Sequence, residues 1–204
     1  MSRPAVDQGS GCEARVYPLF HEFGLPSPIR SDNGVPFATT GIHGLSQLNV
    51  WWMRLGIQHQ RILPAHPQQN GAHERMHKTL KAGAIRPPRA NLTAQQRAFD
   101  SFRTLYNEER PHTFLAGKPP ASVYVPSARS YVEPRGQFDY PGHFDVKVIT
   151  NAGTFRFKKR LLFIAHSLKQ HAIGLEEIDD GIWSIYFCNV LIARVDERDY
   201  ILRG

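Results

Sequence analysis

Apolar residues recur three and four positions apart in four segments of the chain, which predicts four amphipathic helices. The expected ranges are residues 12–23, 44–55, 72–85 and 93–109. Glycine or proline follows the first three, and Thr93 with Gln96 forms an expected capping box at the start of the fourth. The expected core-facing stripe of the fourth helix consists of Ala98, Phe99, Phe102, Leu105 and Tyr106.

Two short extended segments interrupt these helices. Leu25–Arg30 precedes Ser31-Asp32-Asn33-Gly34, a tetrapeptide with strong turn chemistry. Ile57–Leu63 has the length and flanks of a strand, and residues 64–71 form an expected loop. Helices that alternate with strands indicate an α/β arrangement in this part of the chain.

From Phe144 onward the spacing of apolar residues changes to two. Phe155 and Phe157 lie on one face of an expected strand, and about six short strands separated by turns continue to residue 195. This pattern predicts a small sandwich or barrel. We expect a loose terminus at residues 1–11, a first domain at 12–125, a proline-rich linker at 126–137 and a small all-β domain at 138–204.

The net charge of +7 and the isoelectric point of about 9.6 are compatible with a polyanionic partner. The excess lies in residues 1–130, which hold 15 Lys or Arg and 8 Asp or Glu, whereas residues 131–204 hold 10 of each. A basic segment without acids nevertheless runs from Val146 to Leu175. The charge distribution thus suggests two basic surfaces.

Several function classes find no support in the sequence. Cys12 and Cys188 have no zinc or redox spacing, so reduced structural thiols are expected. No apolar run approaches 18 residues and no signal peptide is visible, so we expect a soluble intracellular protein. His73 and His77 have no third ligand in view, and Trp51, Trp52 and Trp183 are expected in the core.

The helix at 72–85 places a carboxylate between two lysines. At 100° per residue, Glu74, Lys78 and Lys81 share one face, while Met76, Leu80 and Ala84 share the opposite face. A solvated Glu–Lys pair would explain this face structurally. A metal-binding carboxylate beside two phosphate contacts would explain it functionally, because hard divalent cations prefer carboxylate oxygens.

A series of ordered motifs gives the chain a family resemblance. They are Leu25-Pro26, Ile29-Arg30-Ser31-Asp32-Asn33-Gly34, Phe37, His66-Pro67-Gln68-Gln69-Asn70-Gly71, His73-Glu74-Arg75-Met76-His77, Leu80-Lys81, Tyr106-Asn107-Glu108-Glu109-Arg110-Pro111-His112 and Pro119-Pro120-Ala121-Ser122-Val123-Tyr124. Together they resemble bacterial insertion-sequence transposases with a retroviral-integrase-like (DDE) catalytic core. The resemblance covers roughly residues 12–130 and extends more weakly into the tail.

The resemblance implies a fold, a metal and a partner. It implies an RNase H-like core followed by helices and a small Src-homology-3-like barrel. It places two of three catalytic carboxylates at Asp32 and Glu74, which would bind Mg²⁺ or Mn²⁺ for phosphoryl transfer on DNA. We expect DNA contacts from Asn33, Asn70, Arg75, Lys78, Lys81, Lys158, Lys159 and Arg160. For the last three, a solvated surface is an equally good explanation.

The first carboxylate of the family triad has no counterpart here. In this fold it precedes the second by three further strands and a helix, a path of roughly 45 residues. Only 31 residues precede Asp32, and Asp7 stands in a segment without strand character. We therefore expect the latter half of a core, truncated at its N-terminus, with an incomplete metal site.

The expected function is a transposase or integrase fragment that binds element ends and target DNA but does not cut DNA alone. One alternative is a non-catalytic DNA-binding protein that regulates a full-length transposase; another is the product of a decayed element. Homo-oligomers or mixed oligomers with a full-length transposase are expected partners, in the cytoplasm and near the nucleoid. The missing strands would leave apolar faces of the helices at 12–23 and 44–55 exposed.

Overall fold

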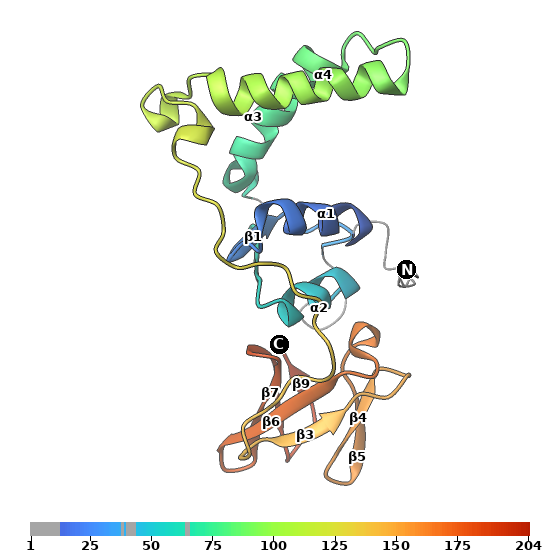
Figure 1. Ribbon diagram of the computed structural model, residues 1–204. Helices are drawn as coiled ribbons and strands as arrows, with labels where there is room; N and C mark the ends of the chain where they lie inside the picture. Colours follow the sequence, from blue (N-terminus) through green and yellow to red (C-terminus); the bar gives the residue numbers. More distant parts are fainter. Residues whose placement is uncertain (1–12, 38, 40–43, 64–65) are drawn as a thin grey trace. The chain divides into compact units, whose positions relative to one another are not determined.

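The computed structural model describes residues 13–37, 39, 44–63 and 66–204. The chain divides into two compact units. Unit 1 combines Met1–Arg61 with Ser127–Gly204, and unit 2 consists of Ile62–Pro126, shown mainly in green in Figure 1. Cys12, Asp7 and the expected loose terminus lie outside the described residues.

The first part of unit 1 is a small β-α-β arrangement. It contains α1 (Glu13–Phe23), β1 (Pro28–Ser31), α2 (Gln47–Arg54) and β2 (Gln58–Arg61). β1 and β2 pair in parallel, with Ile29 opposite His59. Parallel neighbours need a crossover connection, which α2 supplies. The structure confirms both predicted helices and both predicted extended segments, with shorter bounds.

Two apolar clusters cover opposite sides of α2. One joins α1, α2 and the strand flanks through Phe20, Leu25, Leu48, Trp52, Leu55 and Ile57. The other brings Leu45, Val50 and Met53 against the core of the C-terminal strands. The expectation that the helix at 44–55 exposes an apolar face is therefore wrong, because the C-terminal strands cover it. On α1 the expectation is confirmed, since Tyr17, Leu19 and Phe23 are each more than 40% exposed.

Residues 127–131, which we call the strap, pack on the first part of unit 1. Ser127 Oγ donates to the Leu25 carbonyl over 2.6 Å, and Leu25 N donates to the Arg129 carbonyl over 2.7 Å. The Arg129 guanidinium donates to the carbonyls of Pro26, Leu55 and Gly56 at 2.6–3.1 Å. A flexible linker would make few such contacts. The expected domain boundaries stay a prediction, but this part of the expected linker is packed.

The C-terminal part of unit 1 is all β, as the period of two predicted. An antiparallel sheet has the order β3 (Asp145–Val148), β6 (Ala172–Asp179), β7 (Ile182–Phe187), β8 (Val190–Asp196) and β9 (Leu202–Arg203). β4 (Thr154–Phe157) and β5 (Arg160–Phe163) form a separate hairpin beside it (Figure 1). Phe155 and Phe157 are fully buried, as expected, whereas Val146 and Val148 are largely exposed.

Tyr140 closes one face of the C-terminal sheet. Its hydroxyl lies 3.2 Å from the Ala172 and Tyr186 carbonyls and accepts from Cys188 N at 2.9 Å. A Cβ atom on Gly174 would stand 2.5 Å from the Tyr140 ring, so the ring requires glycine at this position. Cys188 is a free, buried thiol, as the sequence predicted, and burial raises its pKa to about 11.

Unit 2 consists of short helices. They are η2 (Pro67–Asn70), α3 (Gly71–Leu80), η3 (Lys81–Ile85), α4 (Leu92–Thr104), η4 (Leu105–Glu109), η5 (Thr113–Leu115) and η6 (Pro120–Ser122). The N-cap of α4 is Asn91, whose side chain accepts from Ala94 N at 2.9 Å. The expected Thr93–Gln96 capping box is therefore wrong, and Gln96 donates to Asp100 instead. Asn91 is the N-cap because it directly precedes Leu92, the first residue of α4, and its side chain can reach a free backbone N–H of the first turn.

The core of unit 2 is thin. Ala84 is fully buried, whereas α3 and α4 contain no buried residue. Of the stripe predicted on α4, Ala98, Phe99, Phe102 and Tyr106 are half-buried. Leu105 is 53% exposed, which corrects its place in that stripe. The π-helical turn at η4 shifts the register after Thr104 and takes Leu105 off the packed face.

No helix in the described part of the chain is long and apolar enough to cross a membrane.

Candidate functional site

Asp32 stands immediately after the carboxyl end of β1. Its side chain is exposed, and Oδ1 accepts a hydrogen bond from Gly34 N over 3.0 Å. This contact forms the turn that the sequence predicted at Ser31-Asp32-Asn33-Gly34. Asn33 is exposed beside it. The hydrogen bond from Gly34 N therefore orients a carboxylate that is exposed to solvent.

A row of polar side chains lies behind Asp32. Ser31 Oγ donates to the Asp32 carbonyl over 2.8 Å and lies 2.7 Å from His59 Nε2. His59 Nδ1 lies 2.9 Å from the Asn49 amide, and Asn49 Oδ1 accepts from Ser46 N over 3.0 Å. Burial, and secondly the charge of Arg61, lower the pKa of His59 below its ordinary value. The sequence alone does not indicate this row, since a lone His on a short strand gives no signal of its partners.

Glu74 occupies the first turn of α3, where a carboxylate complements the helix dipole. Glu74, Lys78 and Lys81 are all exposed, whereas Met76, Leu80 and Ala84 are half-buried or buried. The two predicted faces of this helix are thus confirmed. Among the described residues Glu74 forms no ion pair with Lys78. The structural and the functional explanation of this face both stay predictions.

The remaining predicted residues of unit 2 are accessible. Arg75 is exposed on α3, and Asn70 occupies the N-cap position without a side-chain hydrogen bond to the helix. His73 and His77 are exposed, and their ring centroids lie 4.1 Å apart. In the described residues, no group of three or more His, Cys, Asp or Glu is arranged to hold a metal ion.

The cations of unit 2 are not neutralised by ion pairs. Its nine lysines and arginines are exposed, and none forms an ion pair with a described residue. They are Arg75, Lys78, Lys81, Arg86, Arg89, Arg97, Arg103, Arg110 and Lys118. Only four acids accompany them: Glu74, Asp100, Glu108 and Glu109. Unit 2 therefore carries an excess of five positive charges available to a polyanion.

The basic turn between β4 and β5 is partly occupied by intramolecular contacts. Lys158 Nζ lies 3.0 Å from Glu197 Oε1 and 4.8 Å from the Trp183 ring centroid. The hydrogen bond to Glu197 raises the pKa of Lys158 and lowers the pKa of Glu197. Arg160 stacks over Tyr200 at 4.4 Å, whereas Lys159 is exposed with no ion pair to a described residue. Of these three predicted DNA contacts, Lys159 is the most available.

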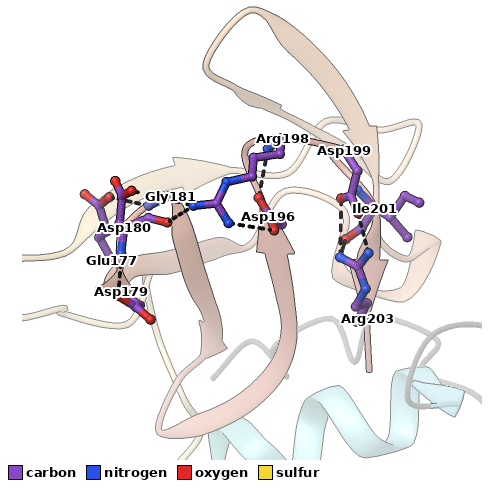
Figure 2. A network of polar contacts seen from close by, with 9 residues as sticks. All are labelled: Glu177, Asp179, Asp180, Gly181, Asp196, Arg198, Asp199, Ile201 and Arg203. Atoms are coloured by element: carbon purple, nitrogen blue, oxygen red, sulfur yellow. Dashed lines mark hydrogen bonds and ion pairs between the residues drawn. The ribbon is translucent and has the colours of Figure 1, made fainter.

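Three acids of the C-terminal part of unit 1, Asp180, Asp196 and Asp199, are also paired with cations (Figure 2). Arg198 lies 3.6 Å from an Asp180 carboxylate oxygen and 3.7 Å from one of Asp196. Arg203 pairs with Asp199 four residues earlier. These pairs balance charge inside the C-terminal part of unit 1. Of the seven net positive charges of the chain, unit 2 holds five and unit 1 holds two.

Asp32 and Glu74 belong to different units, Asp32 to unit 1 and Glu74 to unit 2. Each is exposed and each offers carboxylate oxygens, the hard donors that Mg²⁺ and Mn²⁺ prefer. The donor chemistry therefore fits the expected metal at both positions. Together, Asp32 and Glu74 would supply two carboxylates to a metal ion.

A family model and a solved structure show similarity to the chain. Residues 55–120, about a third of the sequence, match the family model described as integrase core domain. Among solved structures, a chain of the cryo-EM structure of the simian T-cell lymphotropic virus intasome in complex with PP2A regulatory subunit B56 gamma is similar, with 18% identity and a TM-score of 0.44. The match covers 89% of the present chain and 63% of that chain, so the present chain spans less than two thirds of its length.

Proposed function

We propose that this protein binds DNA as part of an integrase-type or transposase-type recombination system. The observation that carries the proposal is the set of nine exposed, unpaired cations in unit 2, within the segment that matches an integrase core. A DNA backbone is a regular polyanion, and its neutralisation by such side chains releases condensed counterions. The expected RNase H-like and Src-homology-3-like folds belong to the same proposal.

In this proposal Asp32 and Glu74 are divalent-metal ligands. A bound Mg²⁺ or Mn²⁺ would neutralise charge on the scissile phosphate and lower the pKa of an attacking water. The chain's own contribution is to orient the Asp32 carboxylate through Gly34 N and to present Glu74 beside Lys78 and Lys81. Those lysines would hold the phosphate backbone next to the carboxylate.

We further propose that these 204 residues do not cut DNA unaided. Two carboxylates supply fewer ligands than the triad of the family that the sequence resembles. A DNA-binding role, such as competition for element ends or mixed assembly with a complete transposase, fits the exposed cations without requiring catalysis. Nicking of supercoiled DNA by the purified chain in Mg²⁺ or Mn²⁺ would contradict this part of the proposal.

The decisive experiment measures duplex DNA binding as a function of salt. Each phosphate that a cation neutralises contributes about 0.9 to the steepness of log K against log salt, so removal of one such contact makes the slope shallower by about 0.9. We expect Lys78→Ala and Lys81→Ala each to reduce the slope by roughly this amount. Lys147→Ala is the matched control, because Lys147 is paired with Asp145 at 2.7 Å. Equal slopes for all variants, or no binding by the unmodified chain, would overturn the proposal.

A further inference from the structure

The buried polar residues of the described chain gather behind Asp32. Of the four buried polar residues of the described chain, Ser31, Ser46 and Asn49 lie there, between 3% and 8% exposed. Ser184, in β7, is the fourth. Buried polar groups lower stability unless they are hydrogen-bonded, so such a concentration beside one carboxylate calls for a reason.

The direction of the hydrogen bonds follows from one backbone group. Ser46 N can only donate, so the Asn49 atom 3.0 Å away must be the amide oxygen. The Asn49 Nδ2 group, a donor, therefore faces His59 Nδ1 at 2.9 Å. His59 Nδ1 must accept, and neutral His59 then carries its proton on Nε2.

The remaining steps reach Asp32. His59 Nε2–H donates to Ser31 Oγ over 2.7 Å, which leaves the Ser31 hydroxyl proton to donate to the Asp32 carbonyl over 2.8 Å. Every bond in this order has one donor and one acceptor. The order begins at the N-terminus of α2 and ends on the backbone of the residue whose carboxylate is oriented by Gly34 N.

We propose that Asn49, His59 and Ser31 act as positioning residues for Asp32, with His59 fixed as its Nε2–H tautomer. The consequence for a metal ligand rests on the proposed function above, whereas the hydrogen-bond order does not. The relay, as we call Ser46–Asn49–His59–Ser31–Asp32, holds the Asp32 peptide and hence its carboxylate in place before any ligand binds. Preorganisation of this kind reduces the reorganisation that ligand binding requires.

A capping role alone does not account for the relay. The α2 capping box needs only Ser46 and Asn49, whose reciprocal contacts are complete without His59. The Trp52 and His59 rings also form an edge-type contact with centroids 5.2 Å apart, which restricts rotation of the His59 ring. Side chains from α2 and β1 thus contact His59: Asn49 lies at Nδ1, and Ser31 lies at Nε2.

The test uses the full chain and nuclear magnetic resonance. Long-range proton–nitrogen correlations of the His59 ring are expected to place the proton on Nε2. Hydrogen exchange at Gly34 N, which donates to Asp32 Oδ1, reports the orientation of Asp32. We expect Ser31→Ala and His59→Ala to accelerate this exchange about tenfold, the effect of one lost hydrogen bond.

Two further variants separate positioning from a general loss of stability. His59→Gln keeps an amide donor near the position of Nε2 and is expected to restore slow exchange, whereas His59→Asn keeps a group only near Nδ1 and is not. Ser184→Ala is the matched control, because it removes a buried hydroxyl remote from the relay. Its Gly34 exchange is expected to equal that of the unmodified chain.

The outcomes are distinct. A proton on Nδ1 in the unmodified chain overturns the relay even where a variant fails to fold, and so does unchanged Gly34 exchange in Ser31→Ala. Titration with Mn²⁺ alone then tests ligand binding at Asp32. Selective broadening near Asp32 that weakens in Ser31→Ala and in His59→Ala, and is retained in His59→Gln, supports positioning of a ligand. Without Mn²⁺ binding, the tautomer and exchange results still decide the relay, and the proposed metal role alone is refuted.

Discussion

Lys158 and Glu197 form an ion pair with 3.0 Å between Nζ and Oε1, and the Trp183 indole donates to the same carboxylate oxygen over 2.6 Å. The basic turn that residues 158–160 form in the sequence is thus divided in the structure. Lys158 is paired with Glu197, which directly follows β8, whereas Lys159 is exposed. This division leads to a prediction about DNA binding.

Lys159→Ala is expected to weaken DNA binding by the turn, whereas Lys158→Ala is expected to have little effect on it. Lys158 would have to leave Glu197 to reach a phosphate, but Lys159 would not. The expected change for Lys159→Ala is a decrease of about 0.9 in the salt slope of the binding constant. Fluorescence anisotropy with a labelled duplex measures it, and a larger effect of Lys158→Ala would contradict the assignment.

Arg129→Ala is expected to reduce the free energy of unfolding of unit 1 by about 2–3 kcal/mol. The guanidinium donates to three carbonyls from two loops, and one hydrogen bond to a charged group contributes about 1.5–3 kcal/mol net. Arg129 is only half-buried, so water replaces part of these bonds in the variant and the expected loss is that of about one bond. Urea denaturation followed by tryptophan fluorescence measures the loss. Arg135→Ala, an exposed arginine a few residues later, serves as the control and should change stability by less than about 0.5 kcal/mol.

Gly174→Ala is expected to lower the free energy of unfolding by about 1–3 kcal/mol, the usual effect of overpacking. The new Cβ would collide with the Tyr140 and Phe144 rings, which contact Gly174 from the segment before β3. Thermal unfolding monitored by circular dichroism measures the change. Gly142→Ala is a suitable comparison, since a Cβ atom there meets no atom within 4 Å. Equal melting temperatures for the two variants would refute the packing described for Tyr140.

Acid is expected to destabilise unit 1 through His59. The folded-state pKa of His59 lies below its ordinary value of 6.5 because of burial and the charge of Arg61. Above that value both states hold a neutral ring, so the contribution of His59 to stability is complete. As the pH falls below about 6.5, the unfolded chain takes up a proton that the folded chain does not, and stability decreases until the lower folded-state pKa is passed.

The measurement compares unfolding between pH 7.5 and 5 for the unmodified chain and for His59→Gln. His171 also has a lowered pKa, through burial and then Arg54, so part of the slope is common to both proteins. The difference between the two profiles isolates His59. Parallel profiles would show that His59 does not take part in the acid transition.

Local patterns in the sequence predicted what depends on local geometry. The faces of α3 follow from the rotation per residue alone, and the structure places Glu74 and Ala84 on the sides expected. The alternation at Phe155 and Phe157 likewise marks the buried face of β4. The turn after β1 follows from the chemistry of Asp32 and Gly34.

Contacts between distant segments could not be predicted in this way. Val50 belongs to a helix whose outer side is covered by strands more than 100 residues later in the chain. Val146 and Val148 alternate correctly but face outward, because period two does not say which side of a strand has a partner. The partners of His59 come from α2 and β1, so no spacing within β2 identifies them.

Unit 1 is assembled from two stretches of chain that unit 2 separates, and the strap is their first point of contact. A ribosome adding about 5–20 residues per second needs roughly 4–14 seconds to extend the chain from Arg61 to Tyr131. During that interval the carbonyls that Arg129 will bind, and the side of α2 that the C-terminal strands will cover, lack their counterparts. The first third of the nascent chain thus exposes apolar surface until the C-terminal strands are synthesised, and we expect holding chaperones to bind it in that interval.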